Sequence, residues 1–179
     1  MLHDSVTSAP KASTRSLWNP WCARNNLGRT LLTLGQTGEA IKRFERAIAI
    51  APGKAAYHFN LARTVALLGH LDQAVAEYRE AVRQSPDDYA SQFNLAMALQ
   101  EKGDTDAAIT EFQKAITLAP GEASFHISLG LSLEEAGRAV DAAREYQQFL
   151  TMAPASPDGP KLKAHIEALS GASGKPSTS

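Results

Sequence analysis

The chain has 179 residues, of which 44% are hydrophobic and 21% are charged, so its composition is that of an ordinary globular protein. Its formal net charge of −1 provides no overall field that would attract nucleic acid or an anionic membrane. A single cysteine, Cys22, excludes an intramolecular disulfide framework, and no apolar run approaches the ~20 residues that span a bilayer.

The N-terminal segment, residues 1–18, is rich in Ser, Thr and Ala, and we expect it to be disordered. It lacks the apolar stretch of a signal peptide, so a cytoplasmic location is expected if this is the native start. Asn19 and Pro20 form a typical helix start. The only two tryptophans, Trp18 and Trp21, either cover the first helix pair or contact another chain.

From residue 21 the sequence repeats every 34 residues, giving repeat 1 (21–54), repeat 2 (55–88), repeat 3 (89–122) and repeat 4 (123–156). Position 1 is the first residue of each repeat. Five residue classes recur, at positions 7, 15, 20, 24 and 32. They are Leu27, Leu61, Leu95 and Leu129; Gly35, Gly69, Gly103 and Gly137; Ala40, Ala74, Ala108 and Ala142; Phe44, Tyr78, Phe112 and Tyr146; and Pro52, Pro86, Pro120 and Pro154.

Each recurring residue has a physical reason. The glycines suit the residue after a helix, where φ turns positive, and the prolines stop a second helix. Asp72 and Asp106 are predicted to be N-caps of second helices. Alanine at position 20 and Gly or Ala at position 8 allow two helices to approach closely, with the aromatic at position 24 beside them. Each repeat is therefore predicted to be helix, turn, helix, turn.

This pattern resembles the tetratricopeptide repeat (TPR) family over residues 21–156. The resemblance implies an all-α, right-handed TPR α-solenoid of four helix-turn-helix repeats over residues 19–156. The chain departs from the family at position 4, where the usual aromatic is replaced by Arg24, His58, Gln92 and His126. Residues 157–170 carry Leu162, Ile166 and Leu169 at helical spacing and are predicted to be a C-terminal capping helix, followed by a disordered tail, 171–179.

No catalytic, metal or cofactor motif is present. The five histidines are not in a metal-binding pattern, and His58 and His126 are two repeats apart. Cys22 has no evident base nearby in the sequence pattern. We therefore expect a protein that is not an enzyme, with no cofactor.

The family resemblance implies that positions 2, 5, 6, 9, 12 and 13 of the first helices line a concave groove, where extended peptides or partner segments lie. These positions are basic in the N-terminal half, apolar in the middle and acidic in the C-terminal half. The candidate partner-binding residues are Asn26, Arg29, Phe59, Asn60, Arg63, Phe93, Asn94, Met97, Ile127, Ser128 and Leu131.

Two questions about this groove stay open at the level of sequence. Phe59 and Phe93 are either half-buried framework residues or anchors for an apolar ligand side chain. The asparagines at position 6, Asn26, Asn60 and Asn94, either bond to neighbouring repeats or hold the main chain of a ligand. The second arrangement looks like the asparagine ladder in the repeat domain of O-linked N-acetylglucosamine transferase.

The sequence therefore favours a protein-interaction scaffold or adaptor that binds an extended peptide or partner segment in the groove. The alternative is a structural assembly module that acts through self-association as a homo-oligomer, or through packing of its edges and convex face. Neither hypothesis involves nucleic acid or insertion into a membrane, and neither names the partner protein.

Overall fold

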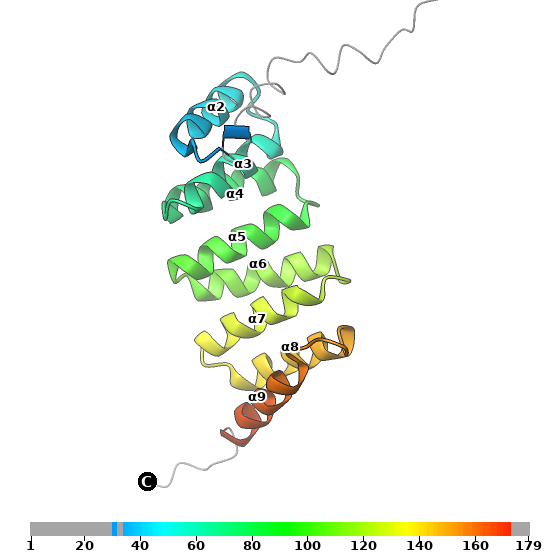
Figure 1. Cartoon of the computed structure of the whole chain (residues 1–179). Coiled ribbons are helices and arrows are strands. Elements are labelled where there is room, and N and C mark those ends of the chain that lie inside the picture. The colour runs from blue at the N-terminus through cyan, green and yellow to red at the C-terminus, as the bar shows by residue number, and fades with distance from the viewer. Residues whose placement is uncertain (1–29, 32–33, 173–179) are drawn as a thin grey trace, which may run out of the picture.

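The computed structural model describes residues 30–31 and 34–172, and in this part of the chain all regular structure is helical (Figure 1). The segments 1–18 and 173–179 lie outside the described residues, as do Trp18, Trp21 and Cys22 and nearly all of the expected first helix. The helices are α2 (Thr37–Ile50), α3 (Ala55–Ala66), α4 (Leu71–Gln84), α5 (Tyr89–Lys102), α6 (Thr105–Leu118), α7 (Ala123–Glu135), α8 (Ala139–Met152) and α9 (Gly159–Ala172).

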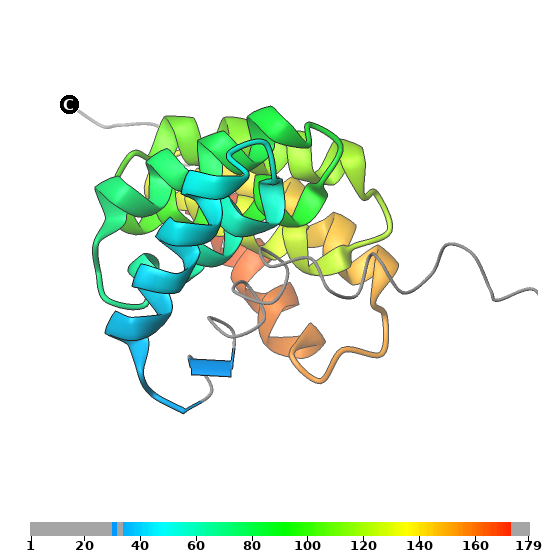
Figure 2. The same ribbon diagram turned by 90° about the horizontal axis from the view of Figure 1, so that it is seen from above.

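The helices pack in the order in which they occur along the chain. Within repeats, α3 packs on α4, α5 on α6 and α7 on α8; between repeats, α2 packs on α3, α4 on α5, α6 on α7 and α8 on α9. The first helices α3, α5 and α7 also touch in succession. Seen from above, the array curves from α2 (blue) to α8 (orange) (Figure 2). This is the all-α solenoid expected from the repeat.

The turn inside each repeat depends on its glycine. Gly35, Gly69, Gly103 and Gly137 have φ between 73° and 89°, a left-handed conformation that residues with a Cβ rarely adopt. The prediction of a positive φ at these glycines is confirmed.

The expected N-caps Asp72 and Asp106 were wrong, because their helices begin earlier. The N-cap residues of α4 and α6 are His70 and Asp104, and Asp72 and Asp106 lie in the first helical turn. A carboxylate there still interacts favourably with the helix dipole. Only α5, among the helices with described caps, has a side-chain cap: Asp88 accepts from the backbone N–H groups of Ala90 and Ser91.

Small residues and aromatics form the core between paired helices. The alanines at position 20 are fully buried, as expected, and so are the aromatic rings packed beside them. In repeat 4 Gly130 on α7 lies directly against the ring of Tyr146 on α8, so that an added Cβ would overlap the ring. The rows of small residues therefore set how near each pair of helices can approach.

Helix α9 covers the open side of repeat 4. Leu162, Ile166 and Leu169 are half-buried and pack against the main core, while Lys163 and Glu167 are exposed. The apolar face that a last repeat would leave in water is therefore closed by a helix whose other side is polar.

Candidate partner-binding groove

The first helices present a row of exposed side chains on one face. Arg63, Met97 and Leu131 occupy position 9 of repeats 2, 3 and 4, and all three are exposed, Met97 at 42% and Leu131 at 51%. This row was expected from the sequence pattern. Asn26 and Arg29, which would continue the site into repeat 1, lie outside the described residues.

A pocket of about 370 Å³ opens on this face between α3 and α5. It brings together three of the predicted site residues, Arg63, Asn94 and Met97. The complete described lining is Arg63, Ala66, Leu67, Tyr78, Asn94, Met97, Ala98 and Glu101. Leu67 is 76% exposed, the most of any large apolar side chain in the described chain. The pocket thus combines an apolar surface with one positive and one negative side chain.

Two side chains of opposite charge line this pocket. Among the described residues, Arg63 and Glu101 form no ion pair, although both line the same pocket. Elsewhere on the surface ion pairs are frequent, as at Lys102 with Asp72 and at Lys114 with Glu111. Within the part of the chain that the structure describes, these two opposite charges therefore have no ion-pair partner and can interact with a ligand.

The aromatic and aliphatic residues at position 5 are partly buried in the framework. Phe59 packs edge-on against Tyr78, with ring centroids 5.7 Å apart. Phe93 stacks on Phe125 at 4.3 Å and also contacts Phe112. With Ile127, which packs on the core as well, these rings support the groove floor and leave Met97 and Leu131 more accessible.

The residues at position 6 differ from repeat to repeat. Asn60 is 7% exposed and already takes part in an interaction inside the protein. The Asn94 amide donates to the carbonyl of Ala90 on its own helix at 2.8 Å, and Asn94 also lines the pocket. Ser128 is half-buried. Of the described members of this series, Asn94 is the one that lines the pocket, so its amide carbonyl can accept a hydrogen bond from a ligand there.

Tyr78, on α4, is one of the residues that line the pocket. Burial raises the pKa of Tyr78 to about 12, against the opposing effect of the positive charge of Arg63. The phenol is therefore protonated at neutral pH and acts as a donor. Arg63 and Tyr78 line the same pocket.

At the C-terminal end of the same face, the carboxylate of Glu134 is already bound by other side chains of the protein. Glu134, at position 12 of repeat 4, accepts from the Tyr146 hydroxyl at 2.5 Å and lies 2.9 Å from His165 Nε2 on α9. The pKa of Glu134 is lowered, because these hydrogen bonds and the His165 charge outweigh the effect of burial, while burial and Glu134 raise the pKa of Tyr146. One of the glutamates that the sequence predicts for the acidic half of the groove is therefore already bound by His165 of the capping helix α9.

A repeated polar pair joins the two helices of repeats 2, 3 and 4, and sequence reasoning missed it. His58 Nδ1 lies 2.7 Å from Glu77, and His126 Nδ1 lies 2.7 Å from Glu145. In repeat 3 the same bond runs from Gln92 to Glu111. The polar residues at position 4 therefore replace the family's aromatic with a hydrogen bond. The signal was present, because glutamate recurs at position 23 of these three repeats.

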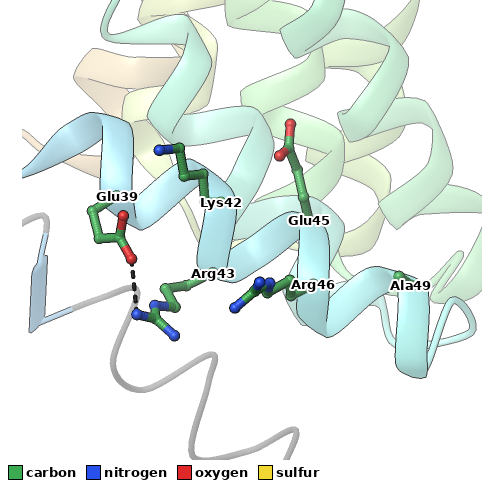
Figure 3. A pocket seen from close by; sticks show the side chains of 6 residues that line it. All are labelled: Glu39, Lys42, Arg43, Glu45, Arg46 and Ala49. Carbon is green, nitrogen blue, oxygen red and sulfur yellow. Dashed lines mark ion pairs between the residues drawn. The ribbon is translucent and has the colours of Figure 1, made fainter.

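Repeat 1 breaks this pairing, since Arg43 stands where the other repeats have glutamate. Arg43 instead forms an ion pair with Glu39 at 2.8 Å, and its buried Nε has no hydrogen-bond partner among the residues that the structure describes. Arg43 and Arg46 project from the same side of α2 beside a cavity of about 540 Å³ (Figure 3). The described lining of this cavity comes from α2 alone and mixes both signs of charge.

The described part of the chain holds no group of three or more His, Cys, Asp or Glu side chains that could bind a metal ion. Over the same residues, no helix combines the length and the apolar character needed to cross a membrane.

Solved structures with the same fold include several MamA proteins. A crystal structure of a MamA protein aligns with a TM-score of 0.78 at 19% identity, over 84% of this chain and 82% of that chain. MamA AMB-1 gives 0.70 at 24% identity, over 79% and 78%. MamA from Desulfovibrio magneticus RS-1, from residue 41 to its end, gives 0.73 at 14% identity, over 88% and 98%. At these identities the likeness shows the fold alone.

No curated protein sequence matches the chain significantly. A sequence profile of the tetratricopeptide repeat, however, matches residues 25–89 and 93–160, which together make up most of the chain. The recurring residues, the helical pairs and this match agree, and the chain belongs to the tetratricopeptide repeat family.

Proposed function

We propose that this protein is a non-catalytic scaffold that binds an extended segment of a partner protein along the inner face of α3, α5 and α7. The observation that carries the proposal is the pocket of about 370 Å³ between α3 and α5, in which Arg63, Asn94 and Met97 from two successive repeats meet. Leu67 and Met97 are exposed there, and Arg63 and Glu101 form no ion pair with any residue that the structure describes, as expected of a ligand-binding surface.

The chemistry of the groove indicates how such a segment is held. Leu67, Met97 and Leu131 offer apolar contact, and Asn94 offers an amide carbonyl to a peptide N–H group. Each main-chain hydrogen bond contributes about 0.5–1.5 kcal/mol net, so affinity depends on several repeats acting together.

The test is selection of peptides from a random display library on the wild-type protein, followed by titration of the selected peptides. Met97→Glu is expected to weaken binding at least tenfold, because it places a charge on the apolar surface. Met152→Glu is the matched control, since Met152 is similarly exposed but lies at the end of α8. Arg63→Glu and the exposed Arg79→Glu on α4 form a second matched pair. Equal loss with the groove and control variants would contradict the proposal.

A second candidate is self-association through the C-terminal edge. Val140 is 50% exposed and lines a pocket of about 350 Å³ between α8 and α9 with Ala143 and Ile166. Light scattering over a range of concentrations separates the two candidates. A dimer that Val140→Glu dissociates and Met97→Glu leaves intact would favour assembly through this edge.

A further inference from the structure

Two tyrosines occupy the same place in repeats 2 and 4 but have different surroundings. Tyr78 and Tyr146 both stand at position 24, and both are 2% exposed. In repeat 4 the hydroxyl of Tyr146 donates to Glu134, and His165 supplies a second donor to the same carboxylate. Repeat 4 therefore contains a carboxylate-binding site, made by Tyr146 and His165, that is filled by the protein's own Glu134.

Repeat 2 has the donors of such a site without the carboxylate. The residue equivalent to Glu134 is Ala66, whose side chain lines the pocket together with Tyr78 and Arg63. Among the described residues the Tyr78 hydroxyl has no hydrogen-bond partner. The short side chain of Ala66 leaves open the space that a glutamate fills two repeats later.

We propose that repeat 2 forms a carboxylate-binding subsite, in which an aspartate or glutamate side chain of the bound segment takes the place that Glu134 takes in repeat 4. This carboxylate accepts a hydrogen bond from the Tyr78 hydroxyl and pairs with the guanidinium of Arg63. The subsite rests on the proposed function, because the ligand is the segment that lies in the groove.

Three features make the subsite selective. Tyr78 keeps its proton at neutral pH, since its pKa is about 12, so it donates and does not repel an anion. Leu67 and Met97 flank the pocket with apolar surface, which weakens competition from water. Glu101, which also lines the pocket, repels a second acidic residue and favours a basic one. The preferred segment therefore carries an acidic residue, an apolar residue and a basic residue in close succession.

The subsite is particular to repeat 2 among repeats 2 to 4. Repeat 3 has Phe112 at position 24, which offers no hydroxyl, and repeat 4 is closed by its own Glu134. Arginine at position 9 likewise occurs in repeat 2, whereas repeats 3 and 4 have Met97 and Leu131.

The probe is a set of four pools of fluorescent heptapeptides, acetylated and amidated so that they carry no terminal charge. The central residue is fixed as Asp, Glu, Asn or Gln, and the other positions mix apolar residues with lysine. Fluorescence polarisation is expected to show the Asp or Glu pool binding about tenfold more tightly than its amide counterpart, because charge-assisted hydrogen bonds are about twice as strong as neutral ones.

Two variants are expected to remove this preference. Tyr78→Phe places in repeat 2 the residue that repeat 3 already has, so the fold is retained while the donor is lost. Ala66→Glu places a carboxylate of the protein itself in the subsite, as Glu134 does in repeat 4. It is expected to lower the affinity for the acidic peptide pools at least tenfold. Tyr146→Phe is the control, because it removes the equivalent hydroxyl outside the pocket and leaves the preference unchanged.

The outcomes separate the subsite from the groove. If the acidic and amide pools bind equally to the wild type, or if Ala66→Glu binds the acidic pools as before, the subsite is wrong. Loss of all pools in Met97→Glu would then still support the groove. If no pool binds at millimolar concentration, both the subsite and the proposed groove fail.

Discussion

Gly130 on α7 lies directly against the ring of Tyr146 on α8, so that a methyl group at residue 130 would overlap the ring. Repeats 2 and 3 have Ala62 and Ala96 at this position, and both are fully buried. Helices α7 and α8 therefore pack closely only because residue 130 has no side chain. It is also held at the other end of the ring, where Tyr146 bonds to Glu134.

Gly130→Ala is therefore expected to destabilise the protein. Overpacking against a fixed ring typically costs about 1–3 kcal/mol, which exceeds the gain in helix propensity of up to about 1 kcal/mol. The measurement is the free energy of unfolding in urea. Gly38→Ala on α2 is the control, because nothing lies within 4 Å of its added methyl group. Stabilisation in both variants would show that α7 and α8 move apart freely.

The polar pairs between positions 4 and 23 predict which substitutions repeat 4 tolerates. His126→Gln is expected to change the free energy of unfolding by less than about 0.5 kcal/mol, because Gln92 makes the same bond to Glu111 in repeat 3. His126→Leu leaves the half-buried Glu145 without its partner and is expected to cost about 1 kcal/mol. Urea denaturation at pH 7 measures both. Equal costs for the two variants would mean that the ring shape matters and the hydrogen bond does not.

Glu134 predicts a pH dependence of stability at the C-terminal cap. Burial alone would raise its pKa, but hydrogen bonds from Tyr146 and His165 lower it below the ordinary value. A carboxyl with a lowered folded-state pKa stabilises the protein fully above its unfolded-state pKa of about 4.3. This stabilisation is lost as the pH falls through the folded-state pKa.

Glu134→Gln is therefore expected to lower stability at neutral pH and to reduce the loss of stability on acidification below about pH 4.3. Thermal unfolding from pH 3 to pH 7 measures this. Glu135→Gln, one residue further along and exposed, is the matched control and is expected to follow the wild type. Parallel curves for wild type and Glu134→Gln would contradict the role assigned to this carboxylate.

The two N-cap aspartates, Asp88 and Asp104, are expected to contribute differently to the free energy of unfolding. Its carboxylate accepts from Ala90 and Ser91 at the start of α5, so Asp88→Ala is expected to cost about 0.5–2 kcal/mol. Asp104 precedes α6 without a side-chain cap and forms an exposed ion pair with Lys102, so Asp104→Ala is expected to cost less. Chemical denaturation of the two variants provides the comparison, and a reversed order would contradict it.

The sequence was sufficient for the features that depend on residue type at a fixed spacing. Gly69 and Gly103 marked their turns because a positive φ excludes most side chains, and Ala74 and Ala108 marked close helix contacts because only small residues fit there. Helix starts were less certain, since Asp72 suits both an N-cap and a first turn. The first helix of repeat 1 lies outside the described residues, so the repeat boundaries there stay a prediction.

The candidate site was only partly predictable for a physical reason. Position numbers placed Arg63 and Met97 on one face, because a helix has a fixed angle per residue. They did not reveal that Tyr78, on the second helix of repeat 2, lines the same pocket. The role proposed for Tyr78 depends on Ala66, which has no carboxylate where repeat 4 has Glu134. It becomes visible only when repeats 2 and 4 are compared. Glu134 was expected in the groove, but its capture by α9 requires contact across 31 residues.

The polar outer side of α9 sets where the array can change in length. Lys163, Ala164 and Glu167 occupy the positions at which a first helix would receive its second helix, and all three are exposed. A further hairpin therefore finds no apolar seat beyond α9. Because each hairpin touches only its neighbours, a duplicate of residues 89–122 fits after Glu122, where it meets the surfaces that α6 and α7 already present to each other. The array can thus be lengthened by inserting whole repeats between existing ones, while α9 remains the C-terminal capping helix.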